Sequence, residues 1–144
     1  MMVAATRRFV LDASVAVAWC FDDETTEFTE TVLDLVAAGA EVLVPSIWPL
    51  EVANALLVAE RRKRIALAKV TAILLRISGL TIAVRPIDPK YAFEHILPMA
   101  RQLGLSQYDA AYLELAVREG LELATLDAAL QKAAKAVGVG LLSA

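Results

Sequence analysis

Apolar residues along the chain alternate between short unbroken runs and longer segments with helical spacing. Phe9, Val10 and Leu11 form the first unbroken run, which is typical of a strand covered on both faces of a parallel sheet. The pattern predicts strands over 8–12, 41–44, 81–84, 121–125 and 139–142, and helices over 14–20, 25–38, 49–64, 66–78, 89–103, 106–119 and 128–137. This alternation predicts an α/β fold of three layers, with a central parallel sheet of about five strands flanked by helices.

Capping and breaking residues define the predicted helix ends. Ser14 is suited to cap the helix after the first strand, and the acidic run 22–24 is suited to the positive end of the next helix dipole. Pro98 falls inside the helix predicted over 89–103, so we expect a kink or a break there. Ser106 followed by Asp109 resembles a capping box, which places Asp109 in a first helical turn.

Four carboxylates follow predicted strands or begin predicted helices. Asp12 follows the first strand, Glu51 lies in the first turn after the second strand, and Asp127 follows the strand over 121–125. Each of these residues alone, like Asp109, is an ordinary helix cap or dipole partner. If the strands are parallel, however, the three strand-linked groups reach one edge of the sheet, and a right-handed crossover can bring Asp109 there too.

Such a concentration of negative charge requires a compensating cation. Two carboxylates about 5 Å apart repel each other by about 3 kcal/mol at an effective dielectric constant of about 20. The sequence contains one histidine, His95, and one cysteine, Cys20, which excludes histidine-rich and cysteine-type metal sites and also Ser-His or Cys-His catalytic machinery. A donor set of carboxylates alone suits a hard ion, Mg²⁺ or Mn²⁺, which also binds substrate phosphates.

Composition limits the domain organisation and the oligomeric state. At 144 residues the chain is expected to form one domain, 1–144. Its content of 58% hydrophobic and 22% charged residues predicts a buried subunit interface, so we expect a homodimer formed through helices in the 25–38 and 50–78 regions. No stretch reaches the ~18 uncharged residues of a membrane span. A single cysteine fits a reducing compartment, and we therefore expect a cytoplasmic protein.

The charge balance restricts contacts with nucleic acid to local ones. A net charge of −3 and a pI near 5.2 exclude a protein that coats nucleic acid by bulk electrostatics. Candidates for contacts with RNA phosphates or an acidic partner are Arg7, Arg8, Arg61, Arg62 and Arg64. The cluster over 61–64 is equally compatible with a solvated helix terminus. Arg7 and Arg8 before an apolar run also resemble a twin-arginine signal, but Asp12 interrupts that run.

Four segments resemble the ordered motifs of PIN-domain proteins, most closely the VapC-type ribonuclease toxins. They are FVLDASV at 9–15, EVANAL at 51–56, SQYDAAY at 106–112 and LATLD at 123–127. The resemblance implies a five-stranded parallel sheet, a Mg²⁺- or Mn²⁺-dependent endoribonuclease site, dimerisation and neutralisation by a small VapB-like antitoxin. By the motif match, the acidic core is formed by Asp12, Glu51 and Asp109, with Asp127 as a more variable fourth member and with Ser14, Asn54 and Thr125 in support.

Two other functions remain as alternatives. A PIN-like scaffold could bind proteins and regulate transcription without catalysis, although such a scaffold need not keep four clustered carboxylates. Phosphoryl transfer through an aspartyl phosphate is less favoured, because haloacid-dehalogenase-like enzymes need a second aspartate where this chain has Ser14. Receiver domains need a lysine at the end of a late strand, where this chain has 125–127 (TLD). Metal-dependent cleavage of RNA separates the first alternative from the nuclease.

Overall fold

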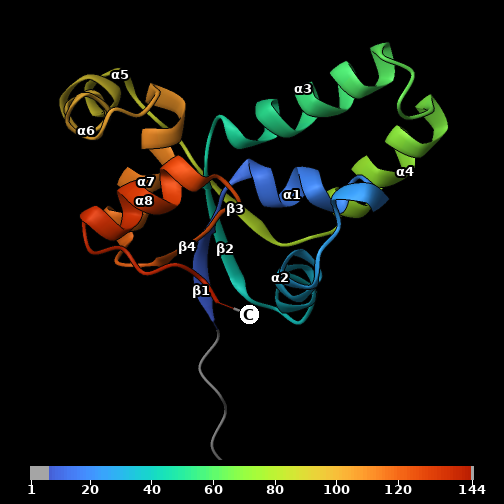
Figure 1. Cartoon of the computed structure of the whole chain (residues 1–144), viewed down its shortest axis with the longest axis horizontal. Helices are drawn as coiled ribbons and strands as arrows, with labels where there is room; N and C mark the ends of the chain where they lie inside the picture. Colours follow the sequence, from blue (N-terminus) through green and yellow to red (C-terminus); the bar gives the residue numbers. More distant parts are fainter. Residues whose placement is uncertain (1–6, 144) are drawn as a thin grey trace, which may run out of the picture.

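Four parallel strands form the sheet in the part of the chain that the structure describes. The structure is a computed structural model that describes residues 7–143. The strands β1 (Arg8–Leu11), β2 (Glu41–Pro45), β3 (Ile82–Arg85) and β4 (Glu122–Ala124) lie in the order β3-β2-β1-β4 (Figure 1). Every residue of β1 and β2 after the first is buried, as expected for strands covered on both faces. The predicted parallel α/β fold is confirmed.

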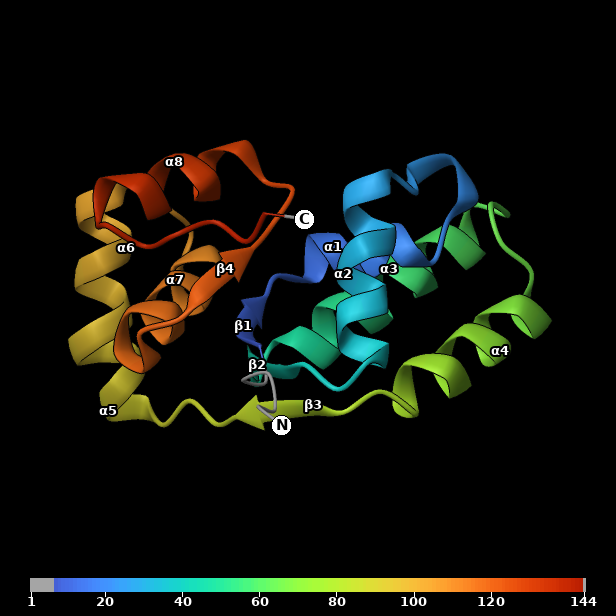
Figure 2. The same cartoon turned by 90° about the horizontal axis from the view of Figure 1, so that it is seen from below.

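Helices lie on both sides of this sheet. On one side are α1 (Ala13–Trp19), α2 (Glu27–Ala37), α3 (Trp48–Arg61) and α4 (Leu67–Ser78), and on the other are α5 (Pro89–Tyr91), α6 (Leu97–Leu103), α7 (Gln107–Glu119) and α8 (Ala128–Ala136) (Figure 2). The 3₁₀ helix η1 (Asp22–Glu24) connects α1 to α2. α7 contacts β1, β2 and β4, and its Tyr112 is the largest fully buried side chain among the described residues. No helix within 7–143 is long and apolar enough to cross a membrane.

The predicted fifth strand over 139–142 is reduced to a single bridge. Leu123 of β4 pairs in parallel with Leu141, and the Leu123 N–H donates to the Gly140 carbonyl at 2.9 Å. Gly140 interrupts the short apolar run, and Gly138, directly before the run, has a φ of 78° that a strand does not adopt. The segment therefore covers part of the β4 edge without continuing the sheet.

The predicted interruption near Pro98 is confirmed as a π-helix. The helical segment is divided into α5, a π-helical turn η2 (Ala92–Ile96) and α6, and the Leu97 N–H donates to the Ala92 carbonyl. Pro98 has no N–H to continue the normal pattern of α-helical hydrogen bonds. His95 lies exposed in this turn with its ring 4.5 Å from that of Tyr91, so it is a helix-surface residue.

Two helix caps differ from the predictions. Ser14 lies inside α1, where it makes no capping hydrogen bond, and Asp12 occupies the N-cap position without a side-chain cap. Thr26 caps α2 through its hydroxyl, which accepts from the Thr29 N–H at 3.2 Å. The acidic run 22–24 therefore does not cap α2 directly, because Thr26 lies closer to the helix and its hydroxyl satisfies one of the free N–H groups of the first turn.

Candidate active site

A cavity of about 540 Å³ opens where β1 and β4 end. β1 and β4 are parallel neighbours with Leu11 paired to Ala124, so the residues after both strands emerge at the same edge. The cavity is lined by all four carboxylates predicted from the sequence, namely Asp12, Glu51, Asp109 and Asp127, and also by Glu24. The structure thus brings the four residues together at the carboxyl edge of the parallel sheet.

Asp12 is the most buried of these carboxylates, with 5% of its surface exposed. Ser14 Oγ donates to Asp12 Oδ2 at 2.6 Å, and Thr125 Oγ1 donates to the same oxygen at 2.7 Å. Burial raises the pKa of Asp12, the two hydroxyls partly offset this, and Asp127 raises the pKa further. The two hydroxyls fix the orientation of Asp12 through one oxygen and make no bond to Oδ1.

Ser14 and Thr125 also connect Asp12 to the turn between β4 and α8. The Leu126 N–H donates to Ser14 Oγ at 3.0 Å, and the Asp127 N–H donates to Thr125 Oγ1 at 3.0 Å. Each hydroxyl therefore accepts from the backbone and donates to Asp12. This arrangement holds the start of α8, and with it Asp127, above the end of β1.

Replacing Thr125 with valine should destabilise the protein. Valine has the shape of threonine but no hydroxyl, so Asp12 loses a donor and the Asp127 N–H loses its acceptor. Loss of a buried hydrogen-bond partner costs about 1–3 kcal/mol in unfolding free energy. Urea unfolding of Thr125→Val and of Thr125→Ser, which keeps the hydroxyl, measures this effect. Equal stability of Thr125→Val and the wild type would show that these bonds contribute nothing.

Glu51 is held in the first turn of α3 by a tyrosine of α7. The Tyr112 hydroxyl donates to Glu51 Oε1 at 2.6 Å, and burial raises the pKa of Tyr112 so far that the hydroxyl stays protonated. Burial also raises the pKa of Glu51. The hydrogen bond from Tyr112 lowers this pKa in part, and the negative charges of Asp12 and Asp109 raise it. Tyr112 therefore orients one oxygen of Glu51 in the same way that the two hydroxyls orient Asp12.

Asp109 and Asp127 both begin helices, but only Asp127 caps its helix through the side chain. Asp127 Oδ1 accepts from the Leu130 N–H at 2.8 Å. The cap of α7 is Ser106, whose Oγ accepts from the backbone N–H of Asp109 at 3.0 Å. Burial raises the pKa of the Asp109 carboxyl, and Asp127 and Asp12 raise it further. The Asp109 carboxylate therefore lines the cavity without being needed for the cap.

The donor chemistry of the cavity fits a hard divalent cation. The carboxylates disfavour each other's charge, as the pKa values of Asp12, Glu51 and Asp109 indicate, and a cation removes that repulsion. Within residues 7–143, however, no three carboxylate, histidine or cysteine side chains are close enough to hold a metal ion as they stand. Glu51, Asp109 and Asp127 are only half-buried, so their side chains can turn toward an ion.

The raised pKa of Glu51 leads to a prediction on pH dependence. A carboxyl whose pKa is raised by folding contributes full stability below its usual value of 4.5 and loses that contribution as the pH rises through the raised pKa. Glu51→Gln cannot ionise and still accepts from Tyr112. In metal-free buffer the melting temperature of this variant should therefore rise relative to that of the wild type as the pH increases above 4.5. Glu94→Gln, on the exposed surface of η2, is the control. A difference in melting temperature between Glu51→Gln and the wild type that does not grow with pH would contradict a raised pKa at Glu51.

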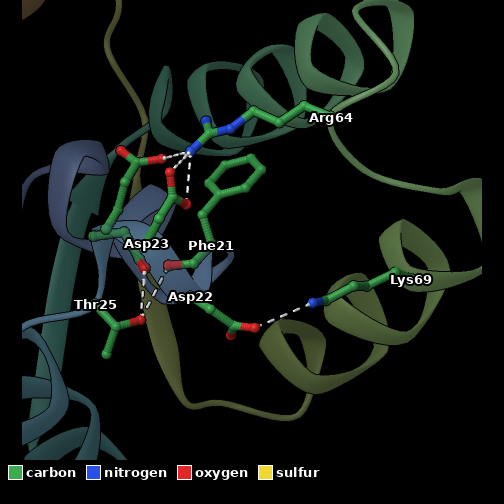
Figure 3. A network of polar contacts seen from close by, with 8 residues as sticks. Phe21, Asp22, Asp23, Thr25, Arg64 and Lys69 are labelled. Carbon is green, nitrogen blue, oxygen red and sulfur yellow. Dashed lines mark hydrogen bonds and ion pairs between the residues drawn. The ribbon is translucent and has the colours of Figure 1, made fainter.

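A network of ion pairs lies beside the cavity and includes Glu24. Arg64 Nη2 lies 2.9 Å from oxygens of both Asp23 and Glu24, and its guanidinium lies 4.1 Å from the ring centroid of Phe21. Figure 3 shows Arg64 reaching from the turn after α3 to η1, where Lys69 approaches Asp22 from α4. These ion pairs thus connect η1 to α4 and to the turn after α3, and Glu24 of η1 also lines the cavity.

Arg7 and Arg8 lie at the opposite end of the sheet from the cavity. Arg8 begins β1 and pairs with Glu41 at 2.9 Å, and Arg7 lies 3.6 Å from Glu122. Glu41 and Glu122 begin β2 and β4, so these pairs mark the amino edge. The four residues of β1 span about 13 Å. The structure therefore does not bring Arg7 or Arg8 to the carboxylates that line the cavity.

Three further predicted residues also lie outside the cavity. Asn54 is exposed, and Ala55 takes the place on the wall one helical turn after Glu51. A spacing of four residues returns closer to the same helix face than a spacing of three. Arg61 and Arg62 are exposed at the end of α3, about 15 Å from Glu51 along the helix.

Comparison with family models identifies the fold. The model of the PIN domain matches residues 9–136, which extend from β1 to the last residue of α8. The chain belongs to the PIN-domain family. The match covers every carboxylate of the cavity, so the cavity of this PIN domain lies wholly within the matched region. No curated protein sequence gives a significant match.

Two solved structures share this PIN fold at low sequence identity. The crystal structure of PAE2754 from Pyrobaculum aerophilum superposes with a TM-score of 0.69 at 23% identity, over 89% of this chain and 79% of that chain. The structure of VapBC2 from Rickettsia felis, bound to a DNA fragment from their promoter, gives a TM-score of 0.64 at 14% identity, over 94% of this chain and 97% of that chain. At these identities the similarity establishes the fold.

Sequence reasoning missed Glu24, which lines the cavity of this PIN domain, and Tyr112, which lies behind the cavity wall and binds Glu51. Tyr112 follows Asp109 by three positions and so shares its helix face, a signal that was available in the sequence. Glu24 had no such signal. It reaches the cavity because η1 folds back toward the end of α3, where Arg64 binds it.

Proposed function

We propose that this PIN-domain protein is a metal-dependent endoribonuclease that acts as a VapC-type toxin in the cytoplasm. The observation that carries the proposal is the convergence of Asp12, Glu51, Asp109 and Asp127 on one cavity at the carboxyl edge of the sheet. PIN domains are generally nucleases, and the chain is a member of that family. An acidic cavity without histidine or cysteine suits hydrolysis assisted by a hard cation.

Each residue has a distinct role in the proposed reaction. Asp12, fixed through Oδ2 by Ser14 and Thr125, presents its other oxygen as the primary ligand. Glu51, oriented by Tyr112, and Asp109 complete the ligand set from the two neighbouring helices. Asp127 adds negative charge close to Asp12 while capping α8. A Mg²⁺ or Mn²⁺ held by these groups would lower the pKa of a bound water and would neutralise charge on the scissile phosphate.

The decisive experiment measures cleavage of single-stranded RNA by the purified protein with and without divalent ions. We expect cleavage in Mn²⁺ or Mg²⁺, none in EDTA, and recovery when the ion is restored. An independent readout is thermal unfolding, because an ion at a hundredfold excess over its dissociation constant should add about 2.7 kcal/mol of stability. A protein that neither cleaves RNA nor gains melting temperature with millimolar Mg²⁺ or Mn²⁺ contradicts the proposal.

One observation favours the alternative of a protein-binding PIN scaffold without catalysis. In the described part of the chain, no three carboxylates lie close enough together to hold a metal ion unless side chains move. A scaffold would tolerate such a spacing, whereas a nuclease must close it on binding the metal. The same thermal unfolding experiment separates the two functions, since a scaffold gains no stability from Mg²⁺ or Mn²⁺.

A toxin of this type requires a small VapB-like antitoxin as its partner. The Rickettsia felis structure contains a toxin and antitoxin pair on promoter DNA, and its fold matches that of this chain. The exposed arginines at the end of α3, Arg61 and Arg62, are candidates for contacts with RNA or with an acidic segment of the antitoxin. Co-expression with the antitoxin should suppress both growth inhibition and RNA cleavage.

We also propose that the protein forms a homodimer through α3 and α4. Exposed leucines concentrate on these two helices, including Leu67 at 68% and Leu75 at 71% exposure, whereas the large exposed hydrophobic residues of the described chain include none from α2. Burying them would remove apolar surface from water. Size-exclusion chromatography with light scattering should report a dimer at micromolar concentration, and Leu75→Glu should shift it toward the monomer. Val117→Glu, at an exposed site on α7, is the control, and a monomeric wild type excludes the dimer.

A further inference from the structure

A second cavity, of about 280 Å³, lies next to the carboxylate cavity on the other side of the α7 amino end. Its walls are mainly apolar and include Ile47, Ile87, Ile96 and Ala111, while Gln107 and Tyr108 supply polar groups. Its volume is close to the lower end of the ~300–1,000 Å³ typical of ligand sites. None of these residues has a role in the proposed hydrolysis, so the cavity has no assigned occupant.

Consecutive residues of α7 face the two cavities. Gln107, Tyr108 and Ala111 line the second cavity, whereas Asp109 lines the first. Successive side chains on a helix diverge by about 100°, so the first turn of α7 separates the two spaces. The start of α3 also contributes to both cavities, because its N-cap residue Ile47 lines the second cavity and Glu51, one turn later along the helix, lines the first. The two cavities are therefore neighbours, so that adjacent units of one polymer could occupy both.

Two side chains give this cavity the chemistry of a nucleobase site. Tyr108 is 63% exposed although it is aromatic, so its ring is available for stacking. Gln107 Nε2 donates to the Ala92 carbonyl at 2.9 Å, which fixes the amide, while Gln107 Oε1 is buried without a hydrogen-bond partner among the described residues. A buried acceptor without a donor is costly, and an N–H on the edge of a base would supply that donor.

We propose that this second cavity is a subsite that binds one base of the single-stranded RNA substrate, next to the phosphate held at the carboxylates. Tyr108 stacks on the face of the base, and Gln107 Oε1 accepts a hydrogen bond from its edge. The apolar walls exclude water from the base. The inference rests on the proposed function, because it assigns to the same enzyme a site that orients its RNA.

Fluorescence of an RNA oligonucleotide that contains 2-aminopurine tests the subsite without cleavage. In EDTA, stacking on Tyr108 should quench the fluorescence as wild-type protein is added, and Tyr108→Phe should behave in the same way. Tyr108→Leu should bind at least ~5-fold more weakly, as expected from the loss of one base–aromatic stack. Phe93→Leu is the matched control, because Phe93 is 68% exposed on η2 but does not line the cavity.

A parallel cleavage assay of the same RNA in Mn²⁺ separates the subsite from the proposed function. Cleavage by wild type with equal quenching by wild type and Tyr108→Leu overturns the subsite and leaves the nuclease intact. Quenching that depends on Tyr108 without any cleavage retains the subsite and overturns the nuclease. Absence of quenching by the wild type overturns the subsite, and an equal loss of quenching in Phe93→Leu overturns it as well.

Discussion

Replacing Asp12 with asparagine is expected to reduce metal-dependent RNA cleavage by more than ~100-fold, since loss of an outer partner of a metal ligand already costs about 10–100-fold. Asparagine keeps the shape of the side chain, and its carbonyl oxygen can still accept from Ser14 and Thr125. The change removes the negative charge, and a neutral amide is a much weaker ligand for a hard cation. Initial rates of RNA cleavage at matched Mn²⁺ concentrations measure the effect.

The control for Asp12→Asn is Asp34→Asn, which makes the same substitution on the exposed surface of α2. Asp34→Asn should cleave RNA at the wild-type rate. Thermal unfolding in EDTA should show that Asp12→Asn remains folded, because the substitution removes a buried charge and keeps acceptors for both hydroxyls. A folded Asp12→Asn variant that cleaves RNA normally would exclude Asp12 from the chemistry.

Asp109→Asn should abolish cleavage to a similar degree while leaving the melting temperature in EDTA unchanged or raised. The hydrogen bond that caps α7 uses the backbone N–H of Asp109 and the hydroxyl of Ser106, so this substitution does not remove it. Burial and two neighbouring carboxylates raise the pKa of Asp109, so a neutral side chain is tolerated at least as well without metal. The only large effect of Asp109→Asn is therefore the loss of a ligand for the metal ion.

Ser106→Ala supplies the complementary variant at the same helix end. It removes the capping oxygen and should cost about 1 kcal/mol of stability, while the Asp109 carboxylate and the cleavage it supports remain. The two variants therefore separate stability from catalysis at neighbouring positions. If Asp109→Asn unfolds the domain, its role is structural, and if it cleaves RNA normally, it is not a ligand.

Much of the fold follows from local sequence patterns, because each strand that is covered on both faces leaves a recognisable apolar run. The runs at β1 and β2 and the helix break near Pro98 were predicted in this way and are confirmed. The gathering of Asp12, Glu51, Asp109 and Asp127 at one cavity also follows from parallel strands and right-handed crossovers.

The remaining features depend on contacts that sequence patterns do not encode. The side of α3 that faces the cavity is set by packing, which selects Ala55 rather than Asn54. The placement of Glu24 depends on an ion pair with Arg64, 40 residues away in sequence. Arg7 and Arg8 were assigned to RNA or to an acidic partner by charge alone, but charge does not reveal that β1 begins at Arg8 and places it at the amino edge of the sheet.

The two hydroxyls that hold Asp12 differ greatly in the time at which they become available during synthesis. Ser14 is made with Asp12, whereas Thr125 follows Asp12 by 113 positions and arrives with β4. β1, β2 and β3 can pair as they leave the ribosome, but contacts of such long separation close last. A nascent chain without β4 also lacks Asp127. The ribosome that makes this protein therefore carries an incomplete cavity until the residues of β4 and α8 have been added.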